Sequence, residues 1–201
     1  MLGSRRMPVK ALDDTLLLAK GNERWCYIHP DDDSKIIKIT YKVKDGRSQN
    51  LLEAAYYRCL QEKGTPLTHL ADCYGWIEIA GQKGLVFERI RDYDGNTALT
   101  LNQIIRGKLL SLEKIKSLLD DLIDYLEENK IVFVDSSFDN IICQRLKDGS
   151  YRLVIIDGLG GRRLGWKFWL YCHLPVYLNY KVKRQRKKVL RNLEIALNLY
   201  G

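Results

Sequence analysis

The feature that most restricts the fold is a change of hydrophobic pattern along the chain. Before about residue 90, most apolar residues fall in short runs bounded by turn residues, which is typical of β-strands. These runs cover residues 15–19, 25–29, 35–41, 74–79 and 84–90. Residues 47–61 instead repeat apolar side chains at helical spacing and stop before Gly64 and Pro66. We therefore predict an antiparallel sheet with one helix in the first half.

The second half has a different order of elements. A polar loop at 91–98 precedes predicted helices at 101–106 and 111–129, the second with Ser111 as its N-cap. Short β-rich runs follow at 131–134, 141–145 and 153–156, and no clear strand is predicted after them. The chain is therefore predicted to be an α+β protein with two lobes, residues 1–90 and 91–201. A cleft between such lobes is the natural place for a ligand.

Composition and cysteine spacing exclude several classes of protein. The five cysteines form no CxxC pair and have no zinc-site spacing with the three histidines, so a reduced, cytosolic compartment is expected. The first twenty residues lack the apolar core of a signal peptide, and no apolar run approaches the ~20 residues of a spanning helix. We therefore expect neither export nor a membrane span.

Three oxygen-bearing side chains carry the strongest chemical signal. Asp135 and Asn140 lie five residues apart, and Asp157 ends the next apolar run, before Gly158. Phosphoryl transfer needs one carboxylate to orient the acceptor hydroxyl and take its proton. It also needs oxygen ligands for Mg²⁺. We predict Asp135 for the first role, and Asn140 with Asp157 for the second.

This spacing resembles the protein-kinase-like superfamily, which implies ATP and Mg²⁺ as substrate and cofactor. By that resemblance Lys38 is the strand lysine that contacts the α- and β-phosphates, and Glu53 is its ion-pair partner. The resemblance also implies that Gly21 marks the phosphate-covering loop. Backbone groups from Glu88 to Ile90 would meet the adenine. The implied fold is a kinase-like N-lobe with an antiparallel sheet and one helix, followed by a small helical C-lobe.

Five further blocks of the sequence carry a closer resemblance. They are Cys26-Tyr27-Ile28-His29-Pro30, Ile36-Ile37-Lys38, Asp94-Gly95, Asn129-Lys130-Ile131-Val132 and Asn140-Ile141-Ile142-Cys143. These blocks resemble the PhoP-regulatory-network YrbL family, small bacterial proteins grouped with kinase-like folds. The resemblance implies a bacterial, cytoplasmic protein linked to low magnesium and envelope stress.

Three positions depart from the protein-kinase motifs and make a small-molecule acceptor the expected one. Phe133 stands where the catalytic loop normally begins with His, Gly21 is the one glycine of its loop, and Asp157 is followed by Gly-Leu. Only 44 residues follow Asp157, which argues against a Ser/Thr/Tyr protein kinase. The predicted acceptor is a hydroxyl of a sugar, a lipopolysaccharide component or another small molecule. The alternative is an inactive kinase fold used as a regulatory or scaffold module.

The end of the chain is basic and aromatic. Residues 161–201 hold ten Lys or Arg and one acid, Glu194, a charge of +9 against +8 for the whole chain. Aromatic residues beside clustered cations, at 166–191, suit peripheral binding to an anionic membrane. Equally, the aromatics could pack into the second lobe and leave the cations on a solvated helix face. Nucleic acid is not expected as a partner, because no recognition motif accompanies the cations.

Overall fold

The computed structural model describes residues 12–43, 48–79, 81–161, 165–173 and 175–200. The chain forms two compact units. The first contains the described residues up to Ala54 together with Asp72–Arg89, and the second contains Ala55–Ala71 and the described residues from Ile90 onward. The segment Ala55–Ala71, which lies within the predicted lobe 1–90, thus groups with the second unit.

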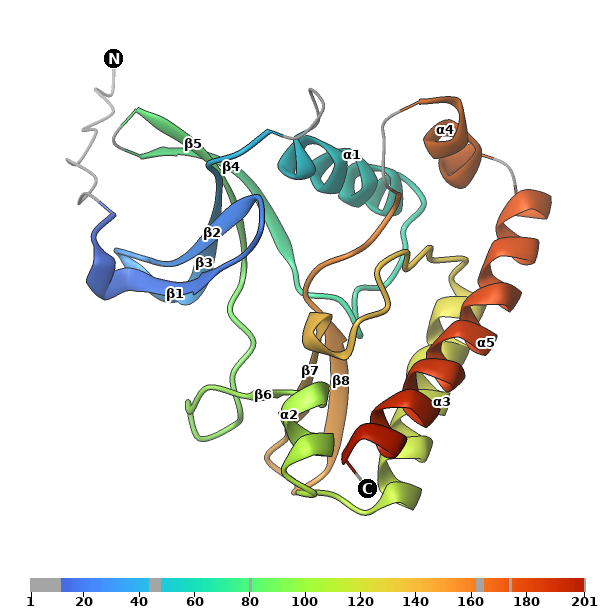
Figure 1. Cartoon of the computed structure of the whole chain (residues 1–201). Coiled ribbons are helices and arrows are strands. Elements are labelled where there is room, and N and C mark those ends of the chain that lie inside the picture. The colour runs from blue at the N-terminus through green and yellow to red at the C-terminus, as the bar shows by residue number, and fades with distance from the viewer. Residues whose placement is uncertain (1–11, 44–47, 80, 162–164, 174, 201) are drawn as a thin grey trace. The chain divides into compact units, whose positions relative to one another are not determined.

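The first unit is built on a five-stranded antiparallel sheet (Figure 1). Its strand order is β1-β2-β3-β5-β4. The strands are β1 (Leu17–Lys20), β2 (Arg24–His29), β3 (Asp32–Thr40), β4 (Cys73–Ile79) and β5 (Gln82–Glu88). The register places Lys38 of β3 opposite Cys26 of β2 and Leu85 of β5. The predicted antiparallel sheet is confirmed, and Lys38 lies on a strand with a partner on either side.

The predicted first strand begins too early. The Asp13 carboxylate accepts a hydrogen bond of 2.8 Å from the Thr15 N–H, and Asp14–Leu16 form a 3₁₀ turn (η1). Asp side chains readily cap a turn in this way, and the capped turn delays the strand to Leu17.

One face of the sheet carries an apolar core. Tyr27, Ile37, Ile39, Ile79 and Val86 are buried together there, with partly buried hydrophobic residues from the start of the chain and from β2 and β4 packed against them. This core stabilises the sheet on the face opposite to Lys38, because neighbouring residues on a strand point to opposite sides.

Helix α1 (Gln49–Glu62) begins in the first unit and ends in the second. Its predicted start at Arg47 lies outside the described residues. Leu52, Tyr56 and Leu60 repeat at every fourth position and are buried, as the spacing predicts. Ala80, between the predicted strands 74–79 and 84–90, also lies outside the described residues, and β5 begins at Gln82.

The second unit combines a three-stranded antiparallel sheet with helices. Its strands, in the order β6-β7-β8, are β6 (Leu99–Thr100), β7 (Ile141–Arg145) and β8 (Tyr151–Ile155). Its helices are α2 (Leu101–Arg106), α3 (Leu112–Glu128), α4 (Trp166–His173) and α5 (Pro175–Tyr200), and the 3₁₀ turn η2 (Phe138–Asn140) leads into β7. Ser111 caps α3, as predicted, by accepting from the Lys114 N–H at 3.2 Å.

The predicted strand at 131–134 is wrong. Among the described residues, this segment pairs in a β-bridge only at Phe133, opposite Leu159. Its backbone groups bond partly to side chains, among them Tyr56 of α1 and Gln185 of α5, and partly to backbone groups of Gly158 and Gly160 outside any named strand. A segment can leave the regular ladder when such partners satisfy its N–H and C=O groups.

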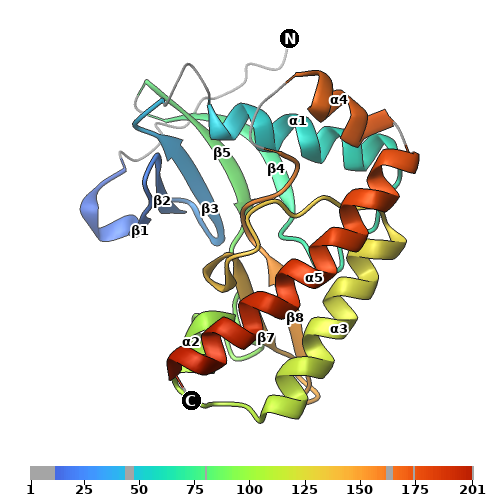
Figure 2. The same ribbon diagram turned by 45° about the vertical axis from the view of Figure 1, so that its right-hand side comes forward.

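Helix α5 lies alongside α3 within the second unit, as both views show (Figures 1 and 2). Arg186 forms ion pairs with Asp120, Asp124 and Glu127 of α3, at 3.1–3.7 Å. Leu178, Val182, Val189, Leu193 and Ala196 are buried. The same helix keeps Lys183, Arg184, Lys187, Lys188 and Arg191 exposed.

The basic and aromatic segment is thus partly packed and partly exposed. Phe168 makes an edge-to-face contact with Tyr56 at 6.2 Å, whereas Trp169 and Tyr180 are exposed. Several other side chains between Trp166 and Asn179 lie outside the described set. No helix in the described part of the chain has the length and apolarity needed to cross a bilayer.

Candidate functional site

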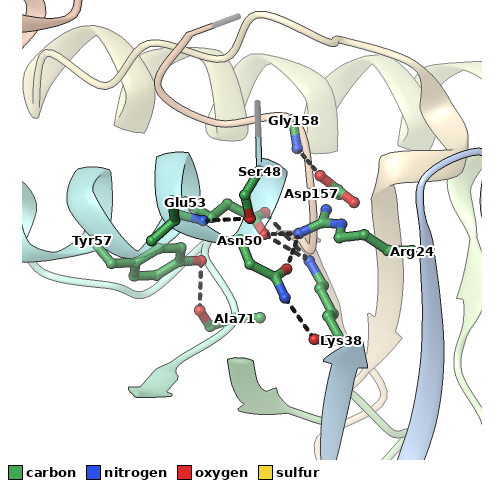
Figure 3. Close-up of polar contacts among 10 residues, drawn as sticks. Arg24, Lys38, Ser48, Asn50, Glu53, Tyr57, Ala71, Asp157 and Gly158 are labelled. Carbon is green, nitrogen blue, oxygen red and sulfur yellow. Dashed lines mark hydrogen bonds and ion pairs between the residues drawn. The ribbon is translucent and has the colours of Figure 1, made fainter. Parts of the chain in front are cut away.

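A buried charged cluster occupies the α1-facing side of the first unit's sheet. The Lys38 ammonium of β3 lies 3.3 Å from Oε1 of Glu53, on α1 (Figure 3). Both side chains are almost completely buried, and the Lys38 Nζ also lies 4.2 Å from the centre of the Phe87 ring. The ion pair that the kinase resemblance implied is therefore present.

Two members of this cluster were missed from the sequence. Arg24 of β2 contacts Oε2 of Glu53 through Nη1, and the same Nη1 donates to Asn50 Oδ1 at 3.0 Å. Asn50 Nδ2 in turn donates to the Lys38 carbonyl at 2.7 Å. Arg24 and Lys38 thus share one carboxylate, and guanidinium and ammonium groups are the side chains that bind phosphates.

The structure also locates Gly21, Glu88 and Ile90, the other residues predicted to contact a nucleotide. Gly21 lies in the turn between β1 and β2, where its N–H donates to the Arg24 carbonyl at 2.8 Å. Glu88 ends β5, and its N–H donates to the Asp72 carbonyl at 2.9 Å. Ile90 is buried with Ala71, Ala98, Ile142 and Val154 in a core of the second unit. Their contact with a nucleotide stays a prediction.

Asp135, Asn140 and Asp157 come together in the second unit through the backbone around Gly158. The Gly158 carbonyl accepts from the N–H groups of Val134 (2.9 Å) and Asp135 (3.2 Å). Asn140 Nδ2 donates to the Asp135 carbonyl at 3.1 Å. The Asn140 carbonyl accepts from the Ile156 N–H at 2.9 Å, one residue before Asp157. Residues 22 positions apart in the sequence thus form one hydrogen-bonded group.

The side chains of this group suit a hard cation. The amide nitrogen of Asn140 donates to the Asp135 carbonyl, so the amide oxygen is the atom of this side chain that would bind a cation. The Asp157 carboxylate accepts from the Gly158 N–H at 2.6 Å, a bond that fixes its orientation (Figure 3). The neighbouring acid Asp139 accepts from Asn102 Nδ2 of α2 at 2.8 Å. Asp139 therefore tethers the turn η2 to α2.

An oxygen pair of this kind fits Mg²⁺ better than a transition metal. In the described part of the chain, no three His, Cys, Asp or Glu side chains gather as a metal site. Mg²⁺ needs no such cage, because one or two protein oxygens with water and phosphate complete its shell. Asn140 and Asp157 would hold the ion on the protein side.

Gly158 allows the close approach within this group. Its φ is +85°, and a Cβ there would lie 2.8 Å from the Asp135 carbonyl oxygen and 2.9 Å from the Asp135 Cβ. These distances are too short for a Cβ contact, so a side chain at position 158 would force neighbouring atoms to move. The nearest of these atoms is the backbone carbonyl oxygen of Asp135.

Gly158→Ala is therefore expected to destabilise the second unit and to displace Asp135. Gly149→Ala is the matched control, because Gly149 has a φ of +81° with nothing within 4 Å of its Cβ position. The control carries only the left-handed backbone strain, about 1–2 kcal/mol. Gly158→Ala adds the clash, about 2 kcal/mol more. Urea unfolding midpoints of the two variants measure the difference. Equal midpoints would show that the close contact between Gly158 and Asp135 does not contribute to stability.

The segment 131–136, which contains Asp135, is held by hydrogen bonds from several elements of the second unit. Val132 donates its N–H to the hydroxyl of Tyr56 at 2.7 Å, and its carbonyl accepts from the Gly160 N–H at 2.8 Å. Burial raises the pKa of the Tyr56 phenol, so this hydroxyl stays protonated. The polar partners that α5 supplies to the segment were not anticipated from the sequence.

The fold and site together define an α+β protein with an antiparallel five-stranded sheet in one unit and a small sheet with helices in the other. Residues 11–194 match the family described as PhoP regulatory network protein YrbL. The chain belongs to this family, which confirms the resemblance of the sequence blocks. Two relatives are called "Uncharacterized protein YrbL", from Escherichia coli (strain K12) and Shigella flexneri. Each is 29% identical over 159 residues, which covers 76% of either chain.

Proposed function

We propose that this protein is an ATP- and Mg²⁺-dependent phosphotransferase of the protein-kinase-like superfamily, with a hydroxyl group as acceptor. The observation that carries the proposal is the hydrogen-bonded group of Asp135, Asn140 and Asp157 around Gly158. A carboxylate for the acceptor and two oxygen ligands for a metal are the parts that phosphoryl transfer requires.

The two units supply different parts of the reaction. The five-stranded sheet with Glu53 on α1 corresponds to a kinase N-lobe, and the unit with Asp135 to a small C-lobe. In the first unit Lys38 and Arg24, both held by Glu53, bind ATP phosphate oxygens. Gly21 covers the phosphates, and the backbone from Glu88 to Ile90 meets the adenine.

Asp135 performs the acceptor chemistry. Its carboxylate accepts a hydrogen bond from the acceptor hydroxyl and takes the proton as the oxygen attacks the γ-phosphorus of ATP. The bond between the γ-phosphorus and the bridging oxygen breaks, and ADP leaves with that electron pair. Asn140 and Asp157 would hold Mg²⁺, which would supply positive charge to neutralise the phosphate oxygens.

The acceptor is proposed to be small: a sugar, a lipopolysaccharide component or a related alcohol. Phe133 in place of the loop histidine and the single glycine at position 21 depart from the pattern of regulated protein kinases, which supports a small acceptor over a protein. The family description, a PhoP regulatory network protein, is compatible with an acceptor from the cell envelope. We place the activity in the cytoplasm, where ATP is available, with the exposed cations of α5 able to contact an anionic membrane surface.

Transfer of radiolabelled γ-phosphate from ATP tests this proposal. Purified protein is incubated with Mg²⁺ and fractionated envelope sugars, and the products are separated from ATP. We expect label in an acceptor fraction with wild type, and none with EDTA or with Asp135→Ala. Labelling that survives Asp135→Ala would remove the catalytic assignment.

A non-catalytic kinase fold is the rival function. Phe133, in place of the expected loop histidine, motivates it, as does the single glycine at position 21. A scaffold of this kind predicts no acceptor labelling and unchanged binding of partners in Asp135→Ala. The transfer assay separates the two functions.

A further inference from the structure

Three polar side chains of α5 reach the backbone of the segment that carries Asp135. Gln185 Oε1 accepts from the Phe133 N–H at 2.6 Å, and its Nε2 donates to the Ile131 carbonyl at 3.0 Å. Lys188 Nζ donates to the Val134 carbonyl at 2.7 Å, and Asn192 Nδ2 donates to the Ser136 carbonyl at 2.7 Å. Side chains at these spacings lie along one side of a helix.

The contacts fall where the segment lacks a regular partner. Residues 131–136 form no strand, so their N–H and C=O groups need other partners. Gln185, Lys188 and Asn192 satisfy four backbone groups on both sides of Asp135. The kinase-like loop normally begins with His at the position of Phe133, whose side chain here is buried and apolar.

We propose that α5 is a built-in part of the phosphoryl-transfer site, with Gln185, Lys188 and Asn192 as positioning residues for Asp135. The proposal rests on the function proposed above. The three side chains act through the backbone of residues 131–136 and fix the direction of the Asp135 carboxylate. They thereby do the work of the missing loop histidine.

The buried apolar residues of α5 make this role separable from folding. Leu178, Val182, Val189 and Leu193 hold the helix to its unit without the three polar side chains. A variant that loses one polar contact should therefore keep α5 docked and release only the segment. A misplacement of about 1 Å at a reacting group can cost roughly 100-fold in rate.

The first test removes the Gln185 contacts. In Gln185→Met we expect faster amide hydrogen exchange across residues 131–136 and a kcat for phosphoryl transfer lower by about 10- to 100-fold. The KM for ATP should stay within about twofold, because nucleotide contacts are untouched. Gln185→Glu keeps an acceptor for the Phe133 N–H but loses the donor to the Ile131 carbonyl. Its exchange rate across residues 131–136 and its kcat should therefore lie between those of wild type and Gln185→Met.

The second test uses two adjacent lysines. Lys187→Met and Lys188→Met each remove one exposed positive charge from α5, but only Lys188 contacts the segment. We expect faster exchange at 131–136 and reduced kcat in Lys188→Met alone. This pair also keeps the proposal testable if Gln185→Met does not fold.

The outcomes separate this inference from the proposed function. Unchanged exchange in both Gln185→Met and Lys188→Met, or equal effects of Lys187→Met and Lys188→Met, would overturn the positioning role. If wild type neither binds nor turns over ATP, the proposed function fails. The exchange comparison would still decide whether α5 holds the segment.

Discussion

Asp135→Asn is expected to lower phosphoryl transfer by about 10³-fold, the usual contribution of a positioned general base. The change keeps side-chain size and removes only the negative charge. Within the described residues, the hydrogen bonds of Asp135 run through its backbone: its N–H donates to the Gly158 carbonyl, and its carbonyl accepts from Asn140. The local structure should therefore persist, and ATP affinity should stay within about twofold. Initial rates at saturating ATP and Mg²⁺ measure the effect.

Asp139→Asn is the matched control for this prediction. Asp139 lies four residues further along and its carboxylate accepts from Asn102 of α2. Its neutral form should retain most of the activity. A comparable loss of phosphoryl-transfer rate in both variants would mean that the rate depends on the loop as a whole. Asp135 would then lose its assignment as the general base.

Glu53→Gln is expected to have the largest effect on stability, about 3 kcal/mol or more. Its carboxylate is shared by the Lys38 ammonium and the Arg24 guanidinium, and all three side chains are at most 8% exposed. Removal of one partner from a buried ion pair costs about 3–5 kcal/mol, because the remaining charge loses its compensation. Urea unfolding of the two-unit chain should show an earlier transition for the first unit.

Glu78→Gln provides the comparison for Glu53→Gln. Glu78 is an exposed residue of β4 in the same sheet, opposite Lys83. Substitutions at exposed positions away from buried contacts change stability little, so the effect should stay within about 0.5 kcal/mol. If both variants unfold at the same urea concentration, the buried cluster is not a source of stability and its assignment as a preformed phosphate-binding group weakens.

Local signals were sufficient for most of the regular elements. The apolar stripe of α3 and its Ser111 cap depend on residues within one or two turns, so the sequence pattern predicts them directly. The same is true of β3, whose Ile36, Ile37 and Ile39 are buried as expected. The Lys38–Glu53 ion pair needed more than periodicity and followed from the family resemblance.

Contacts between distant segments were not predictable in this way. Residues 131–134 have the composition of a strand, but their partners include Tyr56 and Gln185, which lie more than 50 positions away. Arg24 gave only a faint signal, a charged residue at the start of an apolar strand. Arg24 can be buried because Glu53 and Asn50 of α1, more than twenty residues further along the chain, bind its guanidinium group.

The partners of the cations at the basic end of the chain were likewise not predictable from the sequence. Lys187 and Lys188 are equivalent in composition and charge, and the pattern allowed a membrane-binding or a solvated face for both. In the structure Arg186 pairs with acids of α3, and Lys188 binds the carbonyl next to Asp135. Individual cations of one run thus have different partners, which net charge does not show.

Calorimetric titration of ATP, with Mg²⁺ and with EDTA, tests the central claim most directly. The comparison is between wild type and Asp157→Asn, which keeps an oxygen to accept the Gly158 N–H and removes the negative charge that we propose as a ligand for the cation. We predict Mg²⁺-enhanced ATP binding in wild type and loss of the Mg²⁺ enhancement in Asp157→Asn. No ATP binding by wild type, or the same Mg²⁺ dependence in both proteins, would contradict a metal-nucleotide site at Asp157.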